Sequence, residues 1–152
     1  MPRVWVVKVL EEDCHSSAGQ IKEFSERDEV KRATTGTEAW VTSEMLRYLS
    51  QLFSKDNIYF GEVPLTQGRC GPQADIVIGH LTDIDIAIEC KGSEDHKEGV
   101  GKAMVYNQFA DHTGLAVYEG ESYIRDTLFD AGVSFWSFES TRMTTMDDSD
   151  LL

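Results

Sequence analysis

The sequence predicts an α/β fold in which helices pack on the faces of a mixed β-sheet. Two observations predict it. Short segments rich in β-branched residues alternate with amphipathic segments of helical spacing. The strands expected at residues 58–60, 75–79 and 84–91 have connections too short for parallel crossovers, so they should form an antiparallel meander. The later strands are joined through helices, and the whole sheet is therefore expected to be mixed.

The chain is expected to have an N-terminal part, a core and a tail. Residues 2–10 (PRVWVVKVL) favour a strand, and residues 1–36 together should form an N-terminal strand and arm. Thr37 is a suitable N-cap for a helix and opens the core, which we place at residues 37–140. Residues 141–152 are acidic and aperiodic, so we expect a flexible tail.

Three helices are expected in the core, at residues 38–53, 100–110 and 121–130. In the first, apolar side chains recur at spacings of three and four and form a stripe that needs a core to pack on (Val41, Met45, Tyr48, Leu49 and Leu52). Two further strands are expected at residues 115–118 and 133–138, the second of them aromatic.

A length of 152 residues fits one domain, which can bury a core without disulfide bonds. Apolar runs are too short for a membrane span, and no apolar stretch follows the first residues as a secretory signal requires. Three cysteines cannot form a closed disulfide framework. We therefore expect a reduced, cytoplasmic setting.

Charged side chains are placed regularly in residues 72–92, PQADIVIGHLTDIDIAIECKG. In the second strand of this segment, alternation puts isoleucines on one face and Glu89 and Lys91 on the other, about 7 Å apart by strand rise. An antiparallel hairpin can bring Asp75 across from Glu89. Two carboxylates and one ammonium would then converge at one end of a sheet. Mg²⁺ prefers carboxylate oxygens, and when bound it neutralises charge on a phosphodiester.

The pattern Pro72-x-x-Asp75 followed by Glu89-Cys90-Lys91 resembles the PD-(D/E)xK nuclease superfamily, which includes Holliday-junction resolvases, RecB-like exonucleases and many restriction enzymes. The order of elements from about residue 36 to residue 138 is similar to the core of that fold. The resemblance implies a restriction-endonuclease-like core and a Mg²⁺-dependent nuclease that hydrolyses DNA, of the resolvase or repair type, with 5′-phosphate products. Mn²⁺ is expected to substitute for Mg²⁺.

The same resemblance implies roles for individual residues. Asp75 and Glu89 would be the metal carboxylates, with the backbone carbonyl of Cys90 as a third oxygen ligand. Lys91 would be the catalytic lysine, which orients or helps to deprotonate the attacking water.

Further site residues follow from branches of the superfamily. In several branches a Glu on the first core helix completes the site; Glu38 matches best and Glu44 is the second choice. The RecB-like branch often carries Gln-x-x-x-Tyr on the helix after the lysine, and here Lys102 occupies the Gln position, where it can meet a phosphate. Arg69, in a glycine-rich loop, and Lys97 are the other phosphate-contact candidates. Three cysteines cannot ligate the iron–sulfur cluster that some members of that branch hold.

Small members of the superfamily often form homodimers, so that two sites address two strands. The N-terminal strand or the aromatic strand at residues 133–138 is the expected contact. The rings of the aromatic strand are expected to pack in the core rather than to stack on bases (Phe135, Trp136 and Phe138).

The net charge of −13, taken alone, argues against nucleic-acid binding, since Lys and Arg supply most such affinity. The acid excess resembles that of halophilic proteins. At about 1 M salt the Debye length is about 3 Å, so repulsion from DNA would be screened. One competing explanation is a catalytically silent module of the same fold, whose acidic C-terminal third docks a protein partner. An unrelated α/β domain with a coincidental motif is the other.

Overall fold

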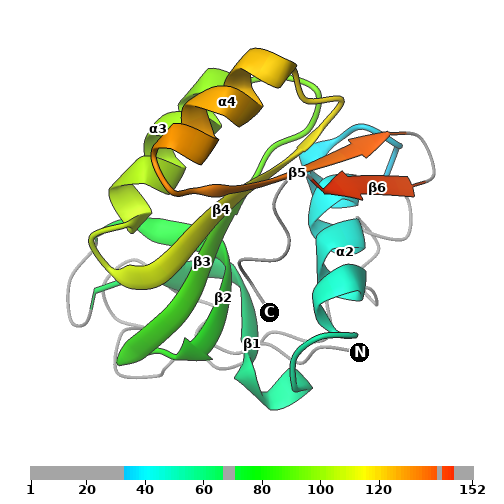
Figure 1. Cartoon of the computed structure of the whole chain (residues 1–152). Coiled ribbons are helices and arrows are strands. Elements are labelled where there is room, and N and C mark those ends of the chain that lie inside the picture. Colours follow the sequence, from blue (N-terminus) through cyan, green and yellow to red (C-terminus); the bar gives the residue numbers. More distant parts are fainter. Residues whose placement is uncertain (1–32, 67–70, 140–141, 146–152) are drawn as a thin grey trace.

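The computed structural model describes residues 33–66, 71–139 and 142–145 (Figure 1). In these ranges the chain forms one six-stranded sheet, in the order β1-β2-β3-β4-β5-β6, with three α-helices packed on it. The fold is therefore α/β, as the sequence predicts. The predicted N-terminal strand at residues 2–10 and the arm that follows it lie outside the described residues.

The first three strands form the predicted antiparallel meander. A short 3-10 helix, η3 (Lys55–Asn57), leads into β1 (Ile58–Pro64), and β2 (Gln73–His80) pairs with both β1 and β3 (Asp83–Cys90). The β2–β3 connection is the tight hairpin that the sequence indicates.

The remaining long strands make the sheet mixed. β4 (Ala110–Tyr118) pairs parallel with β3, and β5 (Ser134–Glu139) pairs parallel with β4. Parallel pairing needs a crossover, and α3 (His96–Tyr106) and α4 (Ser122–Asp130) provide one before each strand. The expected combination of a meander with helix-connected strands is thus confirmed.

Beyond β5 the structure departs from the sequence prediction. Residues 142–145, placed in the aperiodic tail, form β6 (Arg142–Thr145), which pairs antiparallel with β5. The prediction of a tail without regular structure is wrong for this segment, because backbone hydrogen bonds to a neighbouring strand do not depend on side-chain periodicity. Residues 146–152 lie outside the described residues.

The aromatic strand β5 is internal to the sheet. It has β4 on one side and β6 on the other, so it offers no free edge to a second copy of the chain. The homodimer contact expected at this strand or at the N-terminal strand stays a prediction. The three rings of β5 are buried, which confirms the prediction that they pack in the core (Phe135, Trp136 and Phe138).

Helices cover both faces of the sheet. α2 (Glu38–Leu49) packs on one face, and α3 and α4 pack on the other (Figure 1). The side chains of β4 alternate between them: Ala116 belongs to the core under α2, whereas Leu115 and Val117 belong to the core under α3 and α4. Within the described ranges, no helix is both long and apolar enough to cross a membrane.

The ends of α3 differ from the prediction. The helix begins at His96 rather than residue 100 and ends at Tyr106 rather than residue 110. Gly99 and Gly101 weaken the helical signal in its first half, since glycine is a poor helix former. The chain after Tyr106 turns into β4, whose first residue, Ala110, pairs with Ile84 of β3.

Candidate active site

Glu89 lies near the carboxyl end of β3, the strand where the sheet changes from antiparallel to parallel pairing. Its exposed fraction is only 3%, and that of Lys91, which follows the strand, is 8%. The isoleucines of β3 lie on one of its faces and Glu89 lies on the other, and at this end α3 covers that second face as well. Buried charges need partners, so the surroundings of these two side chains decide what they do.

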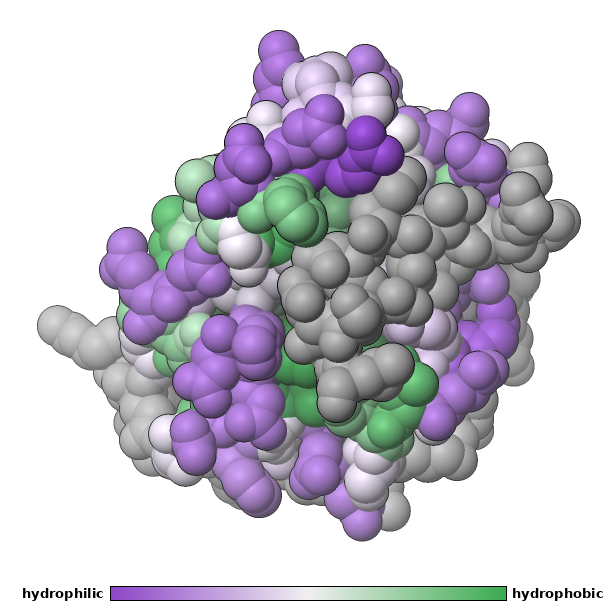
Figure 2. Space-filling view, in the orientation of Figure 1, coloured by the Kyte–Doolittle hydropathy of each residue, from purple (hydrophilic) through white to green (hydrophobic). Residues whose placement is uncertain are grey.

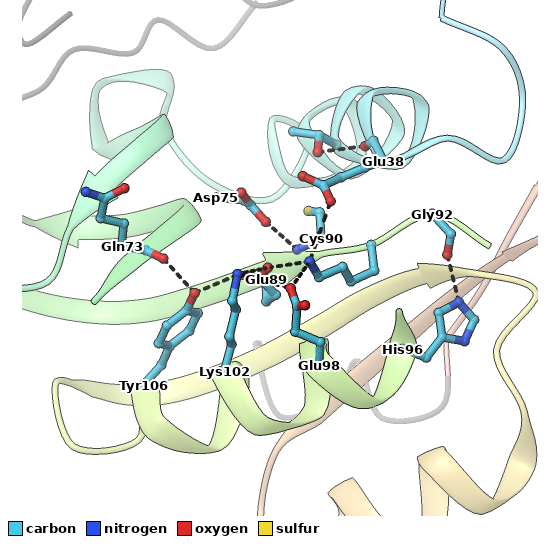
Figure 3. Close-up of polar contacts among 12 residues, drawn as sticks. Glu38, Gln73, Asp75, Glu89, Cys90, Gly92, His96, Glu98, Lys102 and Tyr106 are labelled. Atoms are coloured by element: carbon cyan, nitrogen blue, oxygen red, sulfur yellow. Dashed lines mark hydrogen bonds and ion pairs between the residues drawn. The ribbon is translucent and has the colours of Figure 1, made fainter. Parts of the chain in front are cut away.

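Asp75 reaches the same place from β2. The strand register pairs Ile76 with Ile88, so the next position along each strand brings Asp75 across from Glu89, as the hairpin argument predicts. Asp75 Oδ2 accepts a hydrogen bond of 2.7 Å from the backbone N–H of Cys90. This bond fixes the Asp75 carboxylate beside the end of β3 (Figure 3).

Tyr106, on α3, holds the Glu89 carboxylate in place. The Tyr106 hydroxyl lies 2.6 Å from Glu89 Oε1 and 2.6 Å from the backbone oxygen of Gln73. A hydroxyl carries one proton, so it donates to one of these acceptors at a time. Tyr106 is buried, and it ties α3 to the adjoining strands β2 and β3 (Figure 3).

Two lysines and three glutamates form an ion-pair network between β3, α3 and α2 (Figure 3). Lys91 Nζ donates to Glu98 Oε1 at 2.8 Å, and it lies 3.7 Å from Glu89 Oε2 and 3.8 Å from Glu38 Oε1. Lys102 Nζ lies 3.4 Å from Glu98 Oε1 and 3.8 Å from Glu89 Oε2. Glu89 is therefore approached by both ammonium groups.

The electrostatics of the site follow from burial. Burial, together with the Glu89 charge, raises the pKa of the Asp75 carboxyl well above its ordinary value. Burial also raises the pKa of Glu89, although Tyr106 and the two lysines oppose the rise. Burial alone would lower the pKa of Lys91, but its hydrogen bond to Glu98 and the charges of the nearby glutamates raise it overall. The carboxylate charge is thus incompletely compensated, and Lys91 stays protonated.

Of the two glutamates proposed on the first helix, the structure brings Glu38 to the site. Glu38 is the first residue of α2, and its carboxylate lies 3.8 Å from Lys91 Nζ. Glu44 instead pairs with Arg47 along the surface of the same helix. Thr37 caps this helix as predicted, since its side chain accepts a hydrogen bond from the backbone N–H of Trp40.

Of the predicted phosphate-contact residues, Lys102 lies 3.8 Å from Glu89 Oε2, and Lys97 lines the same cavity as Lys102. Lys97 and Lys102 are both exposed on α3, and Arg69 lies outside the described residues. The Cys90 side chain is fully buried in the core, so only the backbone of this residue is available to the site.

Glu98 and Tyr106 are site residues that the sequence prediction missed. They lie on α3 at spacings of four from Lys102, so all three residues share one face of the helix. The spacing was visible in the sequence. The predicted start of the helix at residue 100 leaves Glu98 outside it. Tyr106 occupies the Tyr position of the RecB-like motif, but the sequence prediction assigns it no contact.

Two cavities adjoin the network. One, of about 510 Å³, lies between α3 and the residues that lead into β2, and Pro72, Gln73, Lys97, Gly101 and Lys102 line it together with Tyr106. The other, of about 260 Å³, lies at the start of α2 and is lined by Glu38 and Lys91 among others. The ion-pair network therefore has open space on two sides.

The donor set decides what cation this site suits. Among the residues that the structure describes, no three His, Cys, Asp or Glu side chains form a group that could hold a metal ion. Asp75 and Glu89 provide two carboxylates whose charge is incompletely compensated, and the Cys90 carbonyl is a further oxygen. Mg²⁺ is commonly bound by one or two carboxylates, with water completing its shell, so these residues fit it.

No family model, curated protein or solved structure matches the chain. The chemistry of the site is therefore argued from its residues and their geometry.

Proposed function

We propose that this chain is a Mg²⁺-dependent nuclease that hydrolyses DNA phosphodiester bonds on a restriction-endonuclease-like core. The observation that carries the proposal is the meeting of Asp75, Glu89 and Lys91 at the end of β3, where Glu89 and Lys91 are almost fully buried. Burying such charges costs stability. Carboxyl groups with perturbed pKa values beside a cavity are typical of functional sites, where the charges serve the activity although they lower stability.

The order of elements supports the same proposal. α2, three antiparallel strands, α3 and a fourth strand parallel to the third follow one another along the chain. This is the order that the resemblance to the PD-(D/E)xK superfamily implies. Glu38, at the start of α2, fits the additional glutamate of several branches.

Asp75, Glu89 and the Cys90 carbonyl would hold Mg²⁺, which when bound neutralises charge on the phosphodiester and makes its water more acidic. The Cys90 N–H orients the Asp75 carboxylate, and Tyr106 orients that of Glu89. Both acceptors are thus held in place before substrate arrives, so little reorganisation is needed during the reaction.

Lys91 would act as a cation rather than as a base. Its pKa is raised, so the ammonium keeps its proton and can hold the attacking water or stabilise negative charge on a phosphoryl oxygen. Hydrolysis adds water across the P–O3′ bond. The bond breaks to leave a 5′-phosphate and a 3′-hydroxyl, as the resemblance implies.

The test is a cleavage assay with Mg²⁺ or Mn²⁺ in high KCl, on a four-way junction, a flap, single-stranded DNA and duplex DNA. We expect cleavage by the unaltered chain and none by Glu89→Gln, Asp75→Asn or Lys91→Met. The matched control is Asp111→Asn, because Asp111 is exposed at the start of β4, which pairs with the start of β3 and so lies at the end of that strand remote from Glu89. It should cleave like the unaltered chain.

Folding is checked on each variant by circular dichroism. Cleavage that survives in folded Glu89→Gln and Asp75→Asn would contradict the proposal. A folded chain that cleaves none of these substrates and binds no Mg²⁺ would instead favour the catalytically silent module that acts through protein contacts.

A further inference from the structure

The geometry points to a subsite for one unpaired nucleotide in the cavity beside α3, which makes single-stranded DNA the substrate class of this site. The inference rests on the proposed function and extends it. The cavity measures about 510 Å³, lies between α3 and the segment leading into β2, and is lined by Lys102, whose Nζ is 3.8 Å from Glu89 Oε2. A nucleotide bound there would be adjacent to the phosphodiester that, under the proposed function, binds at Asp75 and Glu89.

Gly101 is the first observation. It lies within α3 and is exposed, and a Cβ atom at this position would meet nothing within 4 Å. Glycine destabilises the interior of a helix relative to alanine. Packing accounts for the other glycine of this helix, Gly99, since a Cβ there would lie 2.7 Å from Leu115 Cδ1. Among the residues that the structure describes, no contact accounts for Gly101, which lines the cavity.

Glycine on the wall of a cavity allows a ligand to approach the backbone closely. The lining around Gly101 combines charge with apolar surface. Lys97 and Lys102 present ammonium groups that can bind phosphate, although Glu98 also lines the cavity and lies 3.4 Å from Lys102 Nζ. Pro72 and the half-exposed Val105 present an apolar surface on which a base can lie. A nucleotide has a phosphate for the ammonium groups and a base for the apolar surface.

Two further observations favour a single strand over a duplex. A base can enter a cavity of this size only after it leaves its stack, which costs least in DNA that is already unpaired. A duplex also carries a denser line of phosphate charge than a single strand, about one charge per 1.7 Å of its axis. A chain with a net charge of −13 therefore repels a duplex more strongly.

The experiment measures the dissociation constant of a fluorescent oligothymidylate by anisotropy, with Ca²⁺ in place of Mg²⁺, and compares it with a blunt duplex of the same length. Gly101→Ala and Gly101→Leu add side chains of increasing size to the cavity wall. We expect Gly101→Leu to weaken single-strand binding about tenfold, which is the order of one stacked base, and Gly101→Ala to weaken it less. Both variants should have a higher melting temperature, since alanine and leucine are better helix formers.

The matched control is Thr127→Ala on α4, an exposed helical position that does not line the cavity. It also improves helix propensity, and it should leave the dissociation constant unchanged. Because the Gly101 variants are expected to be more stable, their loss of binding would not come from misfolding. Unchanged single-strand affinity in both variants, or tighter binding of the duplex, would overturn the inference.

The outcomes separate this inference from the proposed function. If Glu89-dependent cleavage is found but the Gly101 variants bind normally, the nuclease proposal stands and the subsite is wrong. If single-strand binding depends on Gly101 but no substrate is cleaved with Mg²⁺ or Mn²⁺, the nuclease proposal is wrong and the cavity is a single-strand binding site.

Discussion

The hydroxyl of Tyr106 is the contact through which α3 holds both β2 and β3, since it lies 2.6 Å from the Gln73 carbonyl and 2.6 Å from Glu89 Oε1. In Tyr106→Phe the ring stays, but the one proton that the Gln73 carbonyl and the buried Glu89 carboxylate share is lost. We expect the free energy of unfolding to fall by about 1–3 kcal/mol, the cost of leaving buried polar groups unpaired. Urea denaturation measures it.

The control for this prediction is Tyr123→Phe. Tyr123 lies on α4 with an exposed fraction of 49%, so water can replace any partner that its hydroxyl loses. We expect a change within about 0.5 kcal/mol, as for most surface substitutions. Equal losses in the two variants would show that the Tyr106 hydroxyl has no special role in tying the site together.

Asp75 should make the metal-free chain less stable as the pH rises. Burial and the Glu89 charge raise the pKa of Asp75 in the folded state, so the folded chain keeps this proton to a higher pH than the unfolded chain does. Stability from this group is therefore fully present below the unfolded value of about 4 and is lost as the pH rises through the raised pKa. Asparagine stays neutral and can still accept the hydrogen bond from Cys90.

We accordingly expect Asp75→Asn to raise the free energy of unfolding at pH 8, by about 1 kcal/mol, with the gain shrinking as the pH falls. Urea denaturation in EDTA across this pH range measures it. Asp111→Asn, on an exposed position of β4, is the control and should show no such trend. A less stable Asp75→Asn chain at pH 8 would mean that the Asp75 charge is well compensated. If Asp75→Asn is more stable but no longer cleaves DNA, its loss of cleavage is not caused by a loss of folding.

At the scale of the element, α3 contains two glycines that respond oppositely to the same substitution. A Cβ at Gly99 would lie 2.7 Å from Leu115 Cδ1 and 3.0 Å from Lys91 Cγ, so this glycine lets the Lys91 stem pass close beneath the helix. We expect Gly99→Ala to lower the free energy of unfolding by about 1–3 kcal/mol through overpacking. Gly101→Ala, in open space, should raise it by about 0.5–1 kcal/mol.

Thermal or urea denaturation of the two variants side by side tests this pair, and each is the control for the other. Effects of the same sign would show that helix propensity or packing alone governs both positions. Gly99→Ala should also reduce cleavage, because Lys91 is one of the two neighbours that the new Cβ crowds.

For the whole molecule, charge is the dominant property. The described part of the face in Figure 2 is largely hydrophilic, with apolar residues showing between the charged ones, and the chain carries 27 acidic against 14 basic residues. Such an excess destabilises the compact state by self-repulsion. We expect the melting temperature to rise by several degrees between low salt and molar KCl, as screening removes this repulsion.

Differential scanning calorimetry over a KCl series measures the effect, and a sucrose series is the control, since sucrose stabilises folded proteins without screening charge. The increase should be steepest at low ionic strength, where the Debye length changes most. A melting temperature that is flat or falls over the KCl series would contradict the view that net charge limits stability.

The sequence by itself determined the elements whose signals are local. Helical spacing indicated α2 and α4, β-branched runs indicated β2 and β3, and connection lengths separated antiparallel from parallel pairing. The strand periodicity and the hairpin also brought Asp75 and Glu89 together, because side-chain alternation and register follow from backbone geometry alone.

Tertiary structure alone decided the rest, since it depends on contacts between residues far apart in the chain. The burial of Glu89 and Lys91 follows from α3 covering the second face of β3, and β6 forms on the edge of β5 rather than from its own pattern. The roles of Glu98 and Tyr106 likewise depend on which face of α3 meets the sheet. Gly99 lets that face lie close to Leu115 of β4, a contact between distant parts of the chain that no local spacing encodes.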